Sequence, residues 1–251
     1  VHILQDQAKA ATDSGDWNGA LQSLIEARKI APENADIQYE FAMVAHQLSL
    51  DDDAIAAFQQ TLKLRPNDAP ALYNLGFALM HRGRVDEARR QFAQYIALRP
   101  DDASGYCALG MALADLEQTA DARAQFQRSI ALAPAQSESY YRLGLLDLDA
   151  GDYDAAAQDL HKALERKLND PGALTALGRV DFEQKHYPEA ITLLQQAVGR
   201  DDSLREAHYY LGLTLARMGR KQESDEQLAI AARLEQEHKE QSRNLLRIGK
   251  P

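Results

Sequence analysis

A run of alternating carboxylates between Asp147 and Asp154 forms a group of potential metal ligands. Carboxylates at alternating positions around a glycine are typical of calcium-binding loops, which a glutamate closes. Here Gln158 stands at the closing position, and Gly151 comes one residue too early. The run therefore predicts a tight turn between two helices, and calcium binding is the disfavoured alternative.

The seven histidines could ligate a transition metal, but no two of them are four residues apart and the pattern HExxH is absent. His46 and His81 fall on comparable helix faces. A metal ion between these two side chains is one interpretation of that placement. Solvated or groove-lining histidines are the interpretation that the sequence favours.

Other patterns that carry chemistry are missing or have a structural explanation. Cys107 is the one cysteine, which excludes an intrachain disulfide and a cysteine cage for a metal, and a half-buried apolar role fits it best. No GxSxG elbow and no phosphate-binding glycine loop is present. The arginines from Arg82 to Arg90 are interrupted by Asp86 and Glu87, as on a solvated helix face. We predict no catalytic site, no cofactor and no bound metal.

The composition favours helices and disfavours nucleic acid as a partner. Lys and Arg number 28 against 38 Asp and Glu, a net charge of −10, whereas nucleic acids and anionic membranes attract positive charge. Val, Ile and Thr are scarce beside Ala, Leu, Gln and Glu, which is typical of helical proteins. No apolar run approaches the ~20 residues of a membrane span. The abundance of Ala and Arg indicates a bacterial gene.

The N-terminus does not identify a compartment. The chain starts at Val1 without Met and without the basic-then-apolar pattern of a secretory signal. A leader or further domains could precede it. We expect a soluble protein, and both the bacterial cytoplasm and the periplasm stay open.

Several residue types recur with a period of 34 residues, in one shared register. The recurring positions are Gly76, Gly110, Gly144, Gly178 and Gly212, each after Leu; Pro32, Pro66, Pro100 and Pro134; Ala20, Ala54, Ala88, Ala122, Ala156 and Ala190; and the large apolar residues Leu24, Phe58, Phe92, Phe126, Leu160, Leu194 and Leu228. Such a register predicts a chain of repeated supersecondary units.

This register resembles the tetratricopeptide repeat, a helix–turn–helix unit of 34 residues. The resemblance covers nearly the whole chain and implies an all-α, right-handed superhelical solenoid of antiparallel helix pairs, each with an A and a B helix. The seven expected repeats are residues 1–34, 35–68, 69–102, 103–136, 137–170, 171–204 and 205–238. Residues 239–251, with Leu245, Leu246 and Ile248 on one side, are expected to form a capping helix or tail.

The recurring glycines have a physical purpose. Glycine after Leu lets the A helix approach the B helix closely. A second set, at the A-to-B turn, predicts a left-handed backbone: Gly15, Gly83, Gly151 and Gly219. The first repeat is degenerate: it has Gln7-Ala8 where repeats 3 to 7 have Leu-Gly, and repeat 2 has Phe41-Ala42 at this place.

The resemblance also implies a concave groove lined by the A helices. We number the places of each repeat from its first residue; places two, five, nine, twelve and thirteen face the groove. The candidate partner-binding residues are Tyr39, Met43, Tyr73, Asn74, Phe77, Met80, Met111, Tyr141, Arg142, Leu145, Tyr209 and Leu213. Place nine is commonly polar in this family, but here it is Met43, Phe77, Met111 and Leu145 in repeats 2 to 5. An apolar strip on an open face favours an interaction site, and coverage by neighbouring helices is the alternative.

We therefore expect a non-catalytic scaffold or adaptor. Its partner is another protein that contributes a peptide or helical segment with apolar anchors, and with basic flanks facing acidic rim residues such as Asp36 and Glu138. Two alternatives stay open. One is a substrate-recruiting region cropped from a larger enzyme or a secretion or envelope-assembly component. The other is an array that self-associates into a homo-oligomer. Neither nucleic acid nor direct membrane insertion is expected.

Overall fold

The computed structural model describes the backbone of residues 1–248 and the side chains of residues 1–240. Over the described backbone the chain forms fourteen α-helices and no strand, so it is all-α as predicted. The helices are α1 (His2–Asp13), α2 (Trp17–Ile30), α3 (Ala35–Gln47), α4 (Asp51–Leu64), α5 (Ala69–His81), α6 (Val85–Leu98), α7 (Ala103–Asp115), α8 (Thr119–Leu132), α9 (Ser137–Asp149), α10 (Tyr153–Arg166), α11 (Pro171–Glu183), α12 (Tyr187–Arg200), α13 (Arg205–Arg217) and α14 (Lys221–Ile248).

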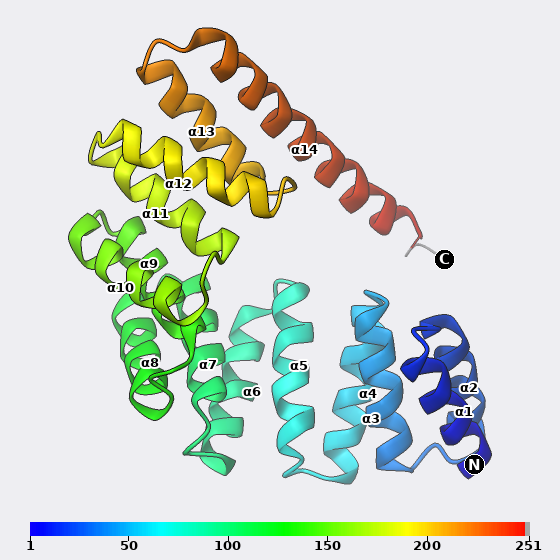
Figure 1. The fold of residues 1–251 in the computed structure, drawn as a ribbon. Helices are drawn as coiled ribbons and strands as arrows, with labels where there is room; N and C mark the ends of the chain where they lie inside the picture. Colours follow the sequence, from blue (N-terminus) through cyan, green and yellow to red (C-terminus); the bar gives the residue numbers. More distant parts are fainter. Residues whose placement is uncertain (249–251) are drawn as a thin grey trace. The chain divides into compact units, whose positions relative to one another are not determined.

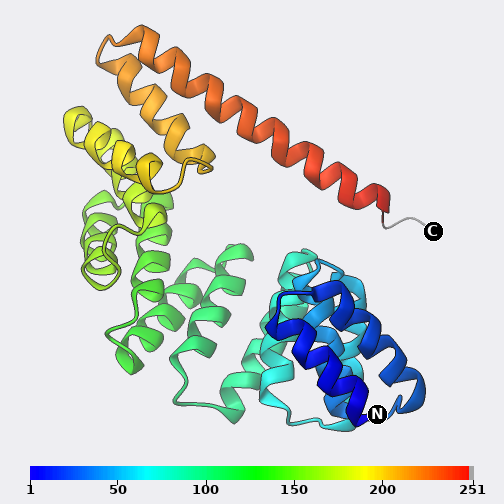
Figure 2. The same ribbon diagram turned by 45° about the vertical axis from the view of Figure 1, so that its right-hand side comes forward.

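The helices divide into two compact parts. The N-terminal part, Val1–Leu132, holds α1 to α8, and the C-terminal part, from Ala133 on, holds α9 to α14. Each odd-numbered helix packs along the even-numbered helix that follows it (Figures 1 and 2). Within the N-terminal part α2 packs on α3, α4 on α5 and α6 on α7, and within the C-terminal part α10 packs on α11 and α12 on α13. Each part is therefore a stack of helix pairs.

The start of several A helices is fixed by an aspartate. Asp68 Oδ1 accepts a hydrogen bond from the Ala71 amide at 3.0 Å, and Asp170 Oδ1 accepts one from the Ala173 amide at 2.9 Å. The first amides of a helix have no partner within the helix, so such caps stabilise its first turn. Together with the prolines that end the B helices, they determine where one pair stops and the next begins.

The turn from each A helix to its B helix passes through one residue in the left-handed region. Gly15, Gly83, Gly151 and Gly219 have φ values between 70° and 79°, which confirms the predicted glycine turns. The same place is left-handed in the other three repeats, where it holds a residue with a side chain: Ser49, Glu117 and Lys185, with φ between 58° and 64°. A Cβ in this region costs roughly 1–2 kcal/mol, so only some of the turns have their most favourable residue.

We expect Gly83→Ala to lower the free energy of unfolding by about 1 kcal/mol. No atom lies within 4 Å of the position its Cβ would occupy, so no clash contributes, and the loss is backbone strain less the unfolded-chain entropy that alanine removes. The opposite substitution at the equivalent place, Glu117→Gly, should stabilise by a similar amount, because the strain it relieves again exceeds the roughly 0.5–1 kcal/mol of unfolded-chain entropy that glycine adds. Denaturant unfolding of both variants measures the difference, and an unchanged Gly83→Ala midpoint would contradict the strain argument.

The core of each helix pair is a small residue of the A helix facing a large residue of the B helix. A Cβ on Gly110 would lie 2.6 Å from Phe126 Cε1, closer than real atoms come, and Phe92 covers Gly76 in the same way. In the C-terminal part the facing pairs are Gly144 with Leu160, Gly178 with Leu194 and Gly212 with Leu228. The rings of Phe92 and Phe126 are fully buried. The repeating glycines thus let the large residues of the B helices pack directly on the backbone of the A helices.

The last helix differs from the other B helices. α14 has 28 residues, and its sequence contains neither glycine nor proline. For that reason no helix boundary occurs at Lys239, and residues 239–248 continue α14 instead of forming a separate capping helix. The expected packing of Leu245, Leu246 and Ile248 falls outside the described side chains. None of the helices in the described part is long and apolar enough to cross a membrane.

Candidate functional site

The candidate groove residues of the N-terminal part lie on the A helices α3, α5 and α7 and keep some exposure to solvent. Met43 on α3 is 38% exposed. The others are half-buried: Tyr39, Tyr73, Asn74, Phe77, Met80 and Met111. By contrast, Leu72, Leu75 and Leu79 on α5 are buried. The two sets occupy different faces of the same helix, so the candidate residues lie on a face that is not enclosed by the core.

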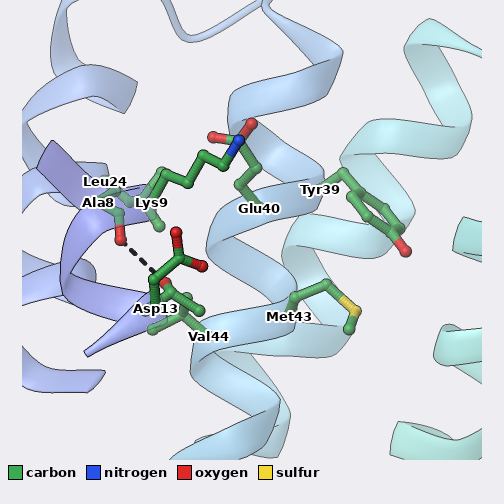
Figure 3. Close-up of a pocket in the computed structure, with 9 residues that line it drawn as sticks. Ala8, Lys9, Asp13, Leu24, Tyr39, Glu40, Met43 and Val44 are labelled. Atoms are coloured by element: carbon green, nitrogen blue, oxygen red, sulfur yellow. Dashed lines mark hydrogen bonds between the residues drawn. The ribbon is translucent and has the colours of Figure 1, made fainter. Parts of the chain in front are cut away.

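A pocket of about 220 Å³ opens between α1 and α3 (Figure 3). Its lining residues are Ala8, Lys9, Thr12, Asp13, Leu24, Tyr39, Glu40, Met43 and Val44. Ala8, Leu24 and Val44 are buried, so the inner wall is apolar, whereas Lys9 and Asp13 are exposed. The volume is below the roughly 300–1,000 Å³ of small-molecule sites, and it suits a single apolar side chain from a partner.

Charged groups lie at the edge of this pocket. Burial raises the pKa of Glu40, a hydrogen bond from Gln5 opposes this shift, and the neighbouring Asp36 adds to it. The Gln5 Nε2 donor lies 3.4 Å from the Glu40 carboxylate. The edge of the pocket therefore carries two acidic groups, Glu40 and Asp13, and one basic group, Lys9. A partly desolvated carboxylate gains from a cationic neighbour, so the pocket edge favours a basic residue beside the apolar anchor.

Tyr39 and Asn74 connect α3 to α5 on this face. Asn74 Nδ2 donates to Tyr39 Oη at 3.1 Å and to the Pro70 carbonyl at 2.9 Å. Burial raises the pKa of the Tyr39 phenol, and the negative charge of Asp68 raises it further. Tyr39 therefore stays protonated, and its O–H can donate to a main-chain carbonyl of a bound segment. Asn74 is held in place by its own contacts.

Phe77 belongs to an aromatic cluster formed by Tyr73, Phe77, Phe92 and Tyr95. The Phe77 and Phe92 ring centroids are 5.1 Å apart, and those of Phe77 and Tyr73 are 5.0 Å apart. Tyr73 also contacts Tyr95 at 5.0 Å. Phe77 thus has one face against the core of its helix pair, and only the remainder of its ring is accessible.

In the C-terminal part the candidate residues are less uniform. Tyr141 and Leu145 on α9 are half-buried and pack against a core cluster that includes Leu160 and Leu177. This is the arrangement expected if neighbouring helices cover the apolar strip. Tyr209 on α13 is 40% exposed. The remaining two candidates are Leu213, which is half-buried, and Arg142, whose Nε lies 2.7 Å from Glu138 Oε1.

Several acidic rim residues already have basic partners in this chain. Asp36 Oδ1 is 2.7 Å from Arg65 Nη1, and Asp149 Oδ1 is 3.0 Å from Arg179 Nη2. Arg179 Nη1 also lies 3.5 Å from Glu206 Oε1. These pairs reduce the negative charge available to a partner, so an acidic rim is a weaker attraction for basic flanks than the formal charges imply.

The remaining chemistry-bearing groups behave mostly as predicted. Asp152 caps α10 by accepting from the Ala155 amide at 3.2 Å, so the carboxylate run is a helix turn. Arg84 pairs with Glu87 at 2.7 Å, as on a solvated face. Cys107 is buried, at 6% exposure, and not half-buried as expected.

The structure brings together one group of residues that the sequence analysis did not assemble. His46 and His81 meet around Asp51, a residue that belongs to no recognised sequence motif. The pocket residues Asp13 and Glu40 were also missed. The sequence does mark Asp51 as unusual, because most of the other repeats have an aromatic or aliphatic residue at its place.

Stacked antiparallel helix pairs with an open A-helix surface define an α-solenoid. Two family models described as Tetratricopeptide repeat match the sequence, one at residues 6–69 and 107–172 and the other at residues 52–111 and 147–211. The chain belongs to the tetratricopeptide repeat family. No curated protein sequence matches it.

Solved structures share the fold. A tetratricopeptide repeat protein from Parabacteroides merdae has a TM-score of 0.80 and 13% identity, over 93% of this chain and 92% of that one. MamA from Desulfovibrio magneticus, residues 41 to the end, has a TM-score of 0.63 and 24% identity, over 67% of this chain and 96% of that one. YrrB, described as a tetratricopeptide repeat protein with an unusual peptide-binding site, has a TM-score of 0.55 and 21% identity, over 75% and 97%. At these identities the likeness concerns the fold.

Proposed function

We propose that this protein is a non-catalytic scaffold that binds an extended or helical segment of a partner protein on the exposed face of its A helices. The observation that carries the proposal is the pocket between α1 and α3, with its apolar inner wall and the partly exposed Met43 at its edge. Met adapts its shape to different partners at low cost, so it is common at peptide-binding surfaces. The peptide-binding site named for YrrB supports the same use of the fold.

In this proposal the partner inserts one apolar side chain into the pocket. A Lys or Arg next to that side chain in the partner meets Glu40 and Asp13, and Tyr39 donates to the partner's main chain. The neighbouring α5 and α7 extend the surface through the accessible parts of Phe77, Met80 and Met111. In the C-terminal part, Tyr209 and Leu213 provide a second apolar surface.

Met43→Gln is expected to weaken binding by about tenfold or more, because it places a polar amide where the apolar anchor packs. The ligand is first selected from a displayed library of random peptides, with the full chain as bait. Fluorescence anisotropy then measures the dissociation constant of the best peptide for the wild type and the variant. Peptides with an apolar residue next to Lys or Arg should dominate the selection.

Met218→Gln is the matched control, since Met218 is 46% exposed and follows α13, outside the candidate surface. This variant should bind as the wild type does. Equal weakening by both substitutions, or binding that neither affects, would contradict the proposed site. Light scattering tests the self-association alternative, which predicts a mass that rises with protein concentration.

A further inference from the structure

Three side chains that suit a metal ion converge in the N-terminal part. His46 lies in the last turn of α3, Asp51 begins α4, and His81 is the last residue of α5. These helices lie side by side (Figure 1) and contact one another. His46 Nδ1 is 2.8 Å from Asp51 Oδ1, and His81 Nδ1 is 3.9 Å from the same oxygen. The three ligand atoms all lie within 4.8 Å of one another.

The fold itself does not require polar residues at these positions. The places of His46 and Asp51 hold Leu148 and Tyr153 in repeat 5 and Phe182 and Tyr187 in repeat 6. The rings of Phe182 and Tyr187 are in contact, with centroids 6.0 Å apart, so in repeat 6 this pair of places forms an apolar contact between the A and B helices. Repeat 2 replaces that contact with a histidine and a carboxylate, which are costlier to bury.

The cluster is partly shielded and its carboxylate has no competing cation among the contacts of the described residues. The side chains of Asp51 and His46 are 13% and 21% exposed, and that of His81 is 62% exposed. Arg82 binds the adjacent carboxylate, Asp52, through two hydrogen bonds of 3.0 Å. This pair holds the end of α5 against the start of α4, which keeps His81 beside Asp51. Solvent reaches the site from the side of His81.

Two imidazole nitrogens and one carboxylate oxygen are a ligand set typical of zinc. Zinc binds nitrogen and oxygen at about 2.0–2.2 Å in tetrahedral geometry, which places its ligand atoms ~3.4 Å from one another. The separations of 2.8 and 3.9 Å lie on either side of that value. We infer that His46, Asp51 and His81 bind a divalent transition-metal ion, with zinc as the best match, and that water fills the fourth position. Each imidazole would bind the metal through Nδ1 as the neutral tautomer that carries its proton on Nε2.

Calorimetric titration of the untagged full chain, stripped with a chelator, tests this inference with zinc chloride. We expect one equivalent of zinc to bind, and no binding of magnesium or calcium, which prefer oxygen ligands. Cobalt provides a second reading, because tetrahedral coordination gives it a characteristic visible absorption. His81→Gln should weaken zinc binding by at least about tenfold, since loss of a partner in the outer shell alone costs roughly 10–100-fold. His81 is exposed, so this variant retains the fold.

The matched control is His186→Gln, because His186 Nδ1 lies 3.7 Å from Asp181 Oδ1 without a third ligand. Zinc should bind this variant as it binds the wild type, and it should raise the melting temperature of both by more than that of His81→Gln at the same zinc concentration. Absence of stoichiometric zinc binding by the wild type would overturn the inference. Equal affinity of the wild type and His81→Gln would overturn it as well.

Discussion

Phe92→Ala is expected to lower the free energy of unfolding by about 3–5 kcal/mol, the largest effect we predict for this chain. The Phe92 ring is fully buried, covers Gly76 and contacts Tyr73 and Phe77. Its removal leaves a cavity between α5 and α6. Gly76, which faces the cavity, has no side chain to fill it. Denaturant unfolding followed by circular dichroism measures the loss.

The control for this prediction is Phe92→Leu, because Leu24, Leu160 and Leu194 occupy the same place in other repeats. Leu keeps most of the buried volume, so the loss should be well below that of Phe92→Ala. Equal destabilisation by Ala and Leu would show that the ring makes a specific aromatic contribution that the cavity argument does not include.

Gly110→Val is expected to destabilise the chain by about 1–3 kcal/mol through overpacking. The first side-chain carbon would lie 2.6 Å from Phe126 Cε1, and valine adds two further methyl groups to that carbon. Because each helix pair packs mainly on its neighbours, the damage should be local, so the unfolding transition should broaden or split. Thermal and denaturant unfolding curves record both effects.

Gly110→Ala provides the comparison, since Ala42 stands at this place in repeat 2 and Phe58 at the place that faces it. Repeat 2 therefore shows that a helix pair accommodates a single methyl group beside a buried phenylalanine ring. We expect a smaller loss for Ala than for Val. Wild-type-like, cooperative melting of Gly110→Val would argue against the helix pairing.

The helical architecture was predictable because it depends on backbone properties of a few residue types. A left-handed turn, which glycine fills best as at Gly83, and a small residue under a large one, as at Gly76, are backbone requirements common to the repeats. Such requirements recur with the period of the structure and can be found in one sequence. Proline acts in the same way at the ends of the B helices.

The side-chain arrangement was less predictable, because it depends on distances between helices. The repeat register places Phe77 on the groove face. Its ring also contacts Phe92, because α5 and α6 lie close enough together for the two rings to meet. Asp51 joins His46 only because the turn at Ser49 brings the start of α4 back to the end of α3. The pocket beside Met43 likewise depends on how far α1 stands from α3. None of these separations has a signature in residue spacing.

The pairing of one small residue with one large residue inside each helix pair has an evolutionary consequence. The volume to be filled is settled within a single repeat, as between Gly110 and Phe126 or between Gly144 and Leu160. Duplication or loss of a 34-residue stretch by recombination would therefore leave every remaining pair complete. The outward-facing residues of one copy can then diverge without compensating changes in another. A histidine–carboxylate cluster can thus arise between repeats 2 and 3 while repeat 6 keeps an apolar contact at the places of His46 and Asp51.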